Sequence, residues 1–262
     1  KKTHVIYWHD ELHDDFDQIL SRRPPLKQGY NYIRNNHFAN FFGNILYYGI
    51  ALPVLALFSY LTGMRVKGKK NLKAIKKTGA FVYSNHVSVP DTYKMAAPVC
   101  MWKRVNILGY TDSLSVPVLK NVVKQLGFLP LPLGPDPENK ANLVKAMDYY
   151  INKKHQIVVI YPEAHIWPYY TKIREFKDVS FNYAYTSGVP VFSLTNTYVK
   201  SRNKLRKKPK VITYIDGPFF ADLSLSKKES IAKLRNEVRD AMVKASQKQE
   251  QYEYKYHYEK EN

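Results

Sequence analysis

Short apolar runs alternate with longer amphipathic stretches along the chain from residue 70 onward. Five of the apolar runs are typical of buried strands, and they cover residues 79–84, 105–108, 156–161, 189–195 and 211–215. Amphipathic stretches follow most of these runs. Because strands that alternate with helices build layered folds, the pattern predicts an α/β fold, a mixed β-sheet flanked by helices.

Two of the expected helices carry recognisable start signals. Asp136 precedes Pro137 and Glu138, which gives a capping side chain followed by a proline in the first turn. Ser226 and Glu229 have the spacing of a capping box. Apolar residues recur at helical spacing after both signals, at Leu143, Val144, Met147 and Ile151 and at Ile231, Leu234, Val238 and Met242.

An uncharged stretch over residues 38–64 precedes the alternating region. It exceeds the roughly 20 residues that a helix needs to cross a hydrocarbon core. It also suits one or two shorter helices in the membrane interface, or a buried core helix. Arg65, Lys67, Lys69 and Lys70 follow at once, which suits anionic headgroups and places the C-terminal side in the cytoplasm. We therefore expect an N-terminal hydrophobic, membrane-associated helical segment.

These patterns divide the chain into four parts. A polar segment covers residues 1–37, the membrane-associated segment covers 38–64, a globular domain covers 65–250 and a polar, Tyr-rich tail covers 251–262. We expect the tail to be frayed. The hydrophobic share of 45% excludes a disordered chain.

The formal net charge is +19, which favours a negatively charged partner. Nucleic acid, anionic lipid, coenzyme phosphates and acidic carrier proteins all qualify. The basic run over residues 200–210 is either a solvated loop or a phosphate contact. Since the sequence has no recognisable nucleic-acid module, we expect no nucleic-acid partner. The one cysteine, Cys100, fits a small core residue in a reducing compartment.

The first candidate for chemistry is the segment of residues 85–91, directly after an expected strand. Ser88 can cap a helix that has residues 89 and 90 in its first turn and Asp91 as its third residue. His86 then lies in the preceding loop and can fold back toward Asp91, which gives a His–Asp dyad. Alternatively, Ser88 and Asp91 form an ordinary cap and His86 is a loop histidine.

A second candidate is the segment Tyr-Pro-Glu-Ala-His at residues 161–165, which follows the expected strand 156–161. Polar groups at the carboxyl end of a strand in an α/β sheet line the usual ligand crevice. Glu163 can bind hydroxyl groups there, or it can lie at a surface strand end without a role.

Four segments in order resemble the glycerolipid acyltransferase superfamily, which includes the glycerol-3-phosphate and lysophosphatidic acid acyltransferases. They are Asn-His-x-Ser-x-x-Asp at residues 85–91, Gly-Phe-Leu-Pro-Leu at 127–131, Tyr-Pro-Glu at 161–163 and Val-Pro-Val at 189–191. A His-x4-Asp motif alone is a weak signal, but four motifs in order are a strong one. The resemblance covers roughly residues 65–220.

This resemblance implies an enzyme. His86 acts as general base on an acceptor hydroxyl while Asp91 holds it, and the hydroxyl oxygen attacks the thioester of acyl-CoA or of an acyl carrier protein. Asn85 and Ser88 then belong to the substrate site, together with Glu163. The expected partners are the acyl donor and membrane lipids, and no bound cofactor is expected.

The sequence departs from the superfamily at two acceptor positions. Leu133 and Ile166 stand where the resemblance implies arginines for the acceptor phosphate, and neither can make bidentate phosphate bonds. Either the acceptor lacks that phosphate, or Lys172, Arg174 and Lys177 supply the charge. We favour as acceptor a lysophospholipid with a larger headgroup or a glycolipid. His165 and the aromatic residues Trp167, Tyr169 and Tyr170 would then pack on that headgroup.

Two other interpretations compete with this one. His9 and His13 have the i, i+4 spacing of two metal ligands on a helix, but Asp10 stands where a zinc protease has Glu, so we expect an exposed polar helix and no metal. The chain can also be a non-catalytic, basic, membrane-tethered protein that binds lipid or nucleic acid.

Overall fold

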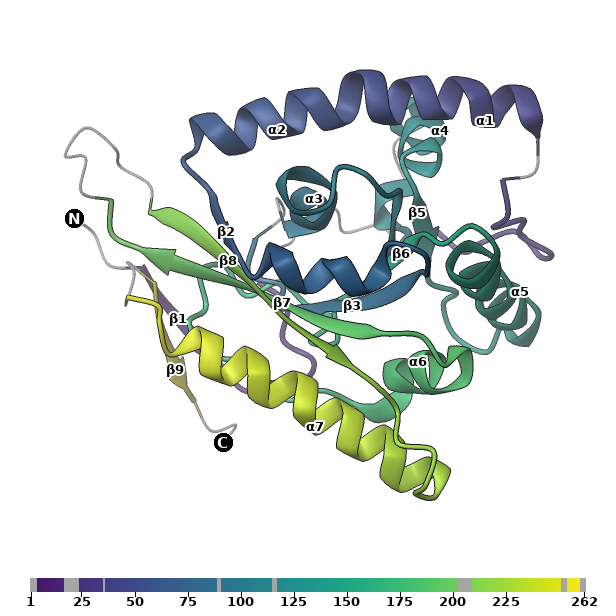
Figure 1. Cartoon of the computed structure of the whole chain (residues 1–262). Helices are drawn as coiled ribbons and strands as arrows, with labels where there is room; N and C mark the ends of the chain where they lie inside the picture. The colour runs from purple at the N-terminus through teal and green to yellow at the C-terminus, as the bar shows by residue number, and fades with distance from the viewer. Residues whose placement is uncertain are drawn as a thin grey trace.

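A seven-stranded mixed sheet forms the centre of the protein (Figure 1). The computed structural model describes residues 4–16, 24–34, 36–88, 91–114, 117–201, 209–250 and 254–259. The strands are β2 (Arg65–Lys67), β3 (Ala80–Ser84), β4 (Val105–Gly109), β5 (Phe128–Pro130), β6 (Ile157–Ile160), β7 (Val191–Val199) and β8 (Lys210–Phe219). Their order is β2-β8-β7-β3-β6-β4-β5, and all neighbours are parallel except β7 and β8. The predicted mixed α/β sheet is confirmed.

Helices cover both faces of this sheet. One face packs against α5 (Pro137–Asp148), α6 (Phe181–Ser187) and α7 (Lys227–Ser246). The opposite face packs against η2 (Lys69–Ile75) and η3 (Met95–Val99), which continues α3 (Asp91–Lys94). The other helical elements of the globular part are η4 (Thr111–Leu114), α4 (Pro117–Gln125), η5 (Tyr149–Lys153) and η6 (Asp178–Ser180).

The central strand β3 shows why both faces are covered. Phe81 and Tyr83 belong to the core under α5, α6 and α7, whereas Ala80 and Val82 belong to the core on the other face. All four side chains are fully buried. Successive strand residues point to opposite faces, so a continuous apolar run predicts helices on both sides.

Both expected helix starts are confirmed. Asp136 caps α5 by accepting a hydrogen bond from the backbone N–H of Asn139, and Ser226 and Glu229 form the capping box of α7. The four apolar residues expected on α7 are all buried. On α5 the expectation is wrong for Val144, which is 40% exposed, because it lies at the edge of the buried face that its neighbour Leu143 occupies.

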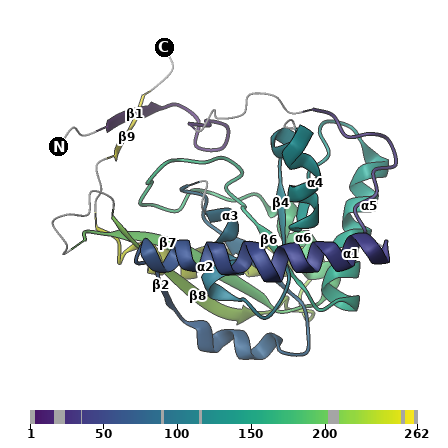
Figure 2. The same ribbon diagram turned by 90° about the horizontal axis from the view of Figure 1, so that it is seen from above.

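The uncharged segment forms one long helix, from α1 (His37–Asn44) through η1 (Ile45–Ala51) to α2 (Leu52–Leu61). It runs across one side of the molecule (Figures 1 and 2). Its inner side buries Tyr47 and Leu52. This helix of residues 37–61 is long and apolar enough to cross a membrane, judged by length and composition alone.

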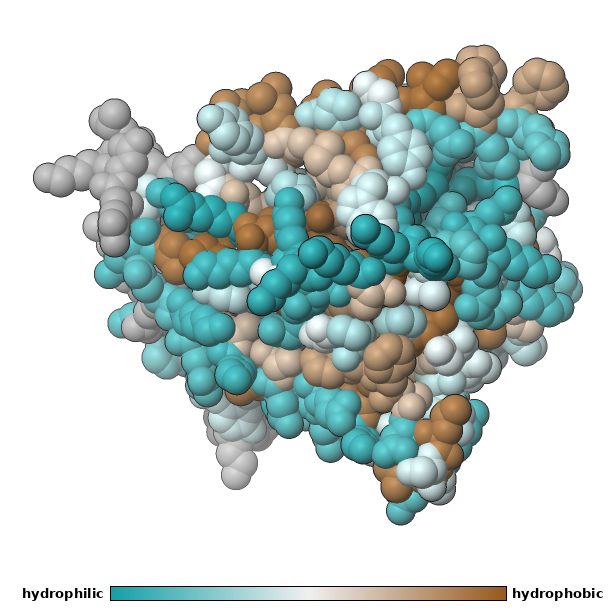
Figure 3. Space-filling model, in the orientation of Figure 1, coloured by the Kyte–Doolittle hydropathy of each residue, from teal (hydrophilic) through white to brown (hydrophobic). Residues whose placement is uncertain are grey.

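The outer side of this helix is apolar and exposed. Figure 3 shows hydrophobic residues gathered along the edge where it lies. The exposed large hydrophobic residues of the helix are Phe38, Phe41, Phe42, Ile45, Tyr48, Ile50, Val54, Leu57, Phe58, Tyr60 and Leu61. Exposed apolar surface of this extent usually marks an interaction site.

The two ends of the chain form a separate two-stranded parallel sheet, β1 (His4–Trp8) with β9 (Tyr254–Tyr258). The expectation of a frayed tail is therefore wrong for residues 254–258. The reason is the alternation of tyrosines in this segment: Tyr256 stacks on Trp167 and Tyr254 stacks on Tyr169. Most of the basic run over residues 200–210 lies outside the described residues.

Candidate active site

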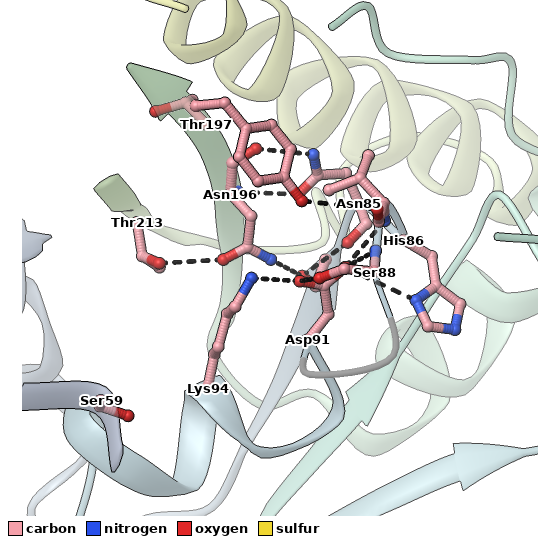
Figure 4. A network of polar contacts seen from close by, with 12 residues as sticks. Ser59, Asn85, His86, Ser88, Asp91, Lys94, Asn196, Thr197 and Thr213 are labelled. Atoms are coloured by element: carbon pink, nitrogen blue, oxygen red, sulfur yellow. Dashed lines mark hydrogen bonds and ion pairs between the residues drawn. The ribbon is translucent and has the colours of Figure 1, made fainter. Parts of the chain in front are cut away.

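Asp91 stands at the start of α3, just beyond the carboxyl end of β3, and is completely buried (Figure 4). Its Oδ2 accepts hydrogen bonds from the backbone N–H groups of Val87 (2.8 Å) and Ser88 (2.7 Å), and its Oδ1 accepts one from the Ser88 hydroxyl (2.8 Å). Ser88 was expected to cap the helix through its side chain, but here its hydroxyl donates to Asp91. Residues 89 and 90, expected in the first turn, lie outside the described residues.

His86 and Asp91 are brought together as expected. The Nδ1 of His86 lies 3.7 Å from Oδ2 of Asp91, which is longer than a hydrogen bond. Tyr161 stacks on the imidazole with the ring centroids 4.2 Å apart, and its hydroxyl donates to the carbonyl of Asp91 (2.9 Å). The ring thus lies between Tyr161, which follows β6, and Asp91 of α3. The long distance to Asp91 is compatible with catalysis, because catalytic hydrogen bonds often tighten only when substrate is bound.

Lys94 is a buried partner of Asp91 that sequence reasoning missed. Its Nζ donates to Oδ1 of Asp91, and its side chain is 2% exposed. Burial alone would raise the pKa of Asp91, but the Lys94 ammonium and His86 lower it to about 2. Asp91 is therefore ionised at neutral pH. The i, i+3 spacing of Asp91 and Lys94 on a helix was the signal available in the sequence.

Glu163 holds the backbone of the loop that carries His86. Its Oε2 accepts from the backbone N–H of His86 (3.1 Å), and its Oε1 accepts from the backbone N–H of Arg174 (2.9 Å). The guanidinium of Arg174 lies 3.5 Å from Oε2. Glu163 is 4% exposed and both of its oxygens are engaged, so its carboxylate holds the backbone of His86. The sequence left open contact with hydroxyl groups or a surface strand end without a role, and the second alternative is wrong because Glu163 is buried.

Arg174 is fully buried, so the less favoured alternative from the sequence, in which its charge binds an acceptor phosphate, finds no support in this structure. Its guanidinium donates to the carbonyls of Glu11 (3.3 Å) and His165, and it lies 4.7 Å from the centre of the Trp167 ring. The segment 165–170 is held in turn by the N-terminal segment, since Trp167 Nε1 donates to the carbonyl of Asp14 (2.8 Å).

The other expected substrate residues occupy three different environments. Lys172 is exposed. His165 is mostly buried, with its Nδ1 3.2 Å from Asp15 and its ring stacked on Tyr110. Asn85 is buried, and its amide exchanges two hydrogen bonds with the backbone of Asn196 on β7 (2.8 and 3.0 Å; Figure 4). Asn85 therefore ties β3 to β7 behind the site.

His9 and His13 follow β1 in a turn rather than on the expected helix. His13 is paired with Asp10 (2.7 Å), and His9 lies 3.6 Å from Glu259. In the described part of the chain no three His, Cys, Asp or Glu side chains are grouped to hold a metal ion.

A cavity of about 490 Å³ opens beside His86. Its walls are mainly apolar and come from the long helix, β4, α4 and β5, through residues such as Ala51, Leu52, Leu55, Ile107, Val123 and Phe128. Polar side chains are fewer, and they include Asp15, Thr92, Tyr110 and Asp112. Ala164 and Ile166 also line this cavity. Largely apolar pockets with a few convergent polar groups are the usual form of a small-molecule site.

Comparison with known proteins points in the same direction. The family model described as Acyltransferase matches residues 63–197. A search of curated proteins gives no match. The fold is similar to the crystal structure of the 1-acyl-sn-glycerophosphate (LPA) acyltransferase, PlsC, from Thermotoga maritima, with a TM-score of 0.55 and 16% identity over 82% of this chain and 89% of that one.

Proposed function

This chain belongs to the acyltransferase family, and from that premise we propose that it transfers a fatty acyl group from a thioester to a hydroxyl of a lysophospholipid-like acceptor, with His86 as general base. The observation that carries the proposal is that His86 lines the mainly apolar cavity. A cavity of this kind suits a lipid chain. It would hold the reacting end of that chain next to the imidazole, which is the proximity that catalysis needs.

The proposed reaction needs one base and one ionised carboxylate. Nε2 of His86 takes the proton of the acceptor hydroxyl as its oxygen attacks the thioester carbonyl. The tetrahedral intermediate then collapses, the C–S bond breaks, and His86 returns the proton to the departing thiolate. Asp91 stabilises the imidazolium that forms between the two steps. The products are an ester and a free thiol, and the donor is acyl-CoA or an acyl carrier protein.

For the acceptor we propose a lipid hydroxyl without a terminal phosphate. Ala164 and Ile166, which follow Glu163 in the chain, line the cavity. The described residues that line it include no Lys or Arg. Arg174 is buried and engaged with Glu163 and two backbone carbonyls. A phosphomonoester site would normally use charge-assisted bonds, so these features support an acceptor with a larger headgroup or a glycolipid.

We also propose that the protein is membrane-associated, with the catalytic domain on the cytoplasmic side. The exposed apolar side of the long helix supports the first part. The cations Arg65, Lys67, Lys69 and Lys70 directly after the helix are all exposed and support the second. Membrane lipids and the acyl donor are then the partners.

The test is acyl transfer by the full chain on anionic vesicles. A labelled acyl-CoA or acyl carrier protein is supplied with a panel of lysophospholipids, and acylated lipid and released thiol are both measured. His86→Ala should lose at least about a hundredfold in turnover while its melting temperature stays that of wild type. His37→Ala, at an exposed histidine, is the matched control. Undiminished transfer by folded His86→Ala would refute the mechanism.

A further inference from the structure

The carboxylate of Asp91 lies between two basic groups, one on each oxygen. Oδ2 faces Nδ1 of His86 at 3.7 Å, and Oδ1 accepts from Nζ of Lys94. Lys94 is buried and is not among the residues that line the cavity. It therefore cannot touch a substrate held there and acts on the reaction only through Asp91.

Each buried carboxylate next to His86 has a buried cation on its other side. Asp91 is paired with Lys94, and Glu163 is paired with Arg174. Tyr161 of the β6 end stacks on the ring, and the hydroxyl of Tyr198 of β7 donates to the carbonyl of Val87. The titratable groups that line the cavity together with His86 include Asp15, Tyr93, Tyr110 and Asp112. The negative charges of Asp91 and Glu163, the two buried carboxylates that contact residue 86, are thus each offset by a buried cation.

We infer that Lys94 is a positioning residue whose charge offsets that of Asp91, so that the carboxylate beside His86 stabilises its imidazolium form less strongly. This inference rests on the proposed function of His86. The physical reason is that a buried carboxylate without another cation stabilises the imidazolium strongly. A protonated His86 could not accept the proton of the acceptor hydroxyl. Lys94 also fixes the carboxylate so that Oδ2 stays turned toward Nδ1.

The experiment is the pH dependence of kcat/KM in two Lys94 variants. Lys94→Gln keeps a side chain of similar length without the charge, and it should move the acid limb of the profile upward by about one to two pH units. Lys94→Arg keeps the charge and should leave the acid limb in place, whatever the turnover rate of this variant. Lys103→Gln is the matched control, because Lys103 is a buried lysine that donates to the carbonyl of His155, and it should not move the limb.

A purely structural role gives a different result. Lys94→Gln would then lose rate equally at all pH values, and an unmoved acid limb would overturn the inference. The shift must also disappear in the Asp91→Asn background, where no carboxylate remains to be offset. If Lys94→Gln does not fold, Lys94→Met takes its place, because it also keeps a side chain of similar length without the charge and must move the acid limb in the same direction.

Titration of the His86 ring by NMR separates this inference from the proposed function. The signal is assigned by its absence in His86→Ala, and its midpoint is compared between wild type and Lys94→Gln. An upward displacement by about one to two pH units supports the coupling even if no acyl transfer is found. An undisplaced midpoint in folded Lys94→Gln overturns it even if the protein is an active acyltransferase.

Discussion

The backbone N–H of His86 donates a 3.1 Å hydrogen bond to Oε2 of Glu163. The two residues follow β3 and β6, which are neighbours in the sheet, although they are 77 positions apart in the chain. Glu163 is in turn fixed by Arg174. The placement of the proposed base therefore depends on a buried ion pair that does not itself line the cavity, and this dependence can be tested.

Removing Arg174 should damage the whole protein rather than one acceptor preference. Arg174→Ala leaves Glu163 buried without its cation, which typically costs about 3–5 kcal/mol. We expect the free energy of unfolding to fall by that amount in urea, and activity to fall for all acceptors alike. Lys172→Ala, at an exposed lysine two positions away, should change stability by less than about 0.5 kcal/mol. A stable Arg174→Ala protein that loses activity only with lysophosphatidic acid as acceptor would show instead that Arg174 binds the phosphate.

Asp91 should make stability depend on pH in a predictable direction. Its pKa in the folded protein is lowered to about 2 by Lys94 and His86 despite burial, against an ordinary value of 3.8. A lowered folded-state pKa means that the stabilisation is fully present above pH 4 and is lost as the pH falls through about 2. We expect the stability advantage of wild type over Asp91→Asn to shrink over this window in urea unfolding series. An advantage that grows on acidification would contradict the ion pairing.

Membrane binding is best tested on the exposed side of the long helix. Deleting the helix would also uncover the core at Tyr47 and Leu52, so substitutions are the sharper tool. Phe42→Ser and Leu57→Ser change residues that are 64% and 59% exposed, and folding should be unaffected. Each should weaken binding to anionic vesicles at least about tenfold, because burying such a side chain contributes about 1.5–3 kcal/mol.

The control for this experiment is Leu223→Ser. Leu223 is 75% exposed but follows β8, away from the long helix. We expect its vesicle binding to equal that of wild type in a sedimentation assay. Equal binding by all three variants would mean that the basic domain alone attaches the protein to the membrane.

Local patterns in the sequence were enough to predict the sheet, since β3 and β6 are short apolar runs. They left the His86–Asp91 pair as one of two alternatives, and only the resemblance in four segments favoured the pair. The surroundings of Arg174 could not be predicted, because its partners come from Glu11, Glu163 and His165, which no local pattern connects.

The pairing of β1 with β9 was missed for the same reason. It joins residues at opposite ends of the chain, and a pairing of such separation leaves no local signal beyond the alternation of tyrosines in β9. The polar composition of the tail suggested fraying, but the stacking of Tyr254 and Tyr256 on the segment around Trp167 outweighs it.

The last prediction concerns the acceptor, and it uses the position of Ile166 in the cavity wall. If the site lacks a phosphate-binding cation, wild type should use lysophosphatidic acid at least about tenfold less efficiently than an acceptor without a phosphomonoester, measured as kcat/KM. Ile166→Arg should then raise the efficiency with lysophosphatidic acid about ten- to a hundredfold, because one charge-assisted hydrogen bond contributes about 1.5–3 kcal/mol.

Ile166→Gln separates charge from size in this test. Its side chain is polar and long but uncharged, so it should leave the preference among acceptors near that of wild type, and monoacylglycerol should gain from neither variant. A wild-type enzyme that prefers lysophosphatidic acid, and that Ile166→Arg does not improve, would show that another cation already binds the phosphate. In that case Lys172→Ala, at the exposed lysine that the sequence offered as an alternative, should abolish the preference for lysophosphatidic acid. Our own prediction is that Lys172→Ala leaves the choice of acceptor unchanged.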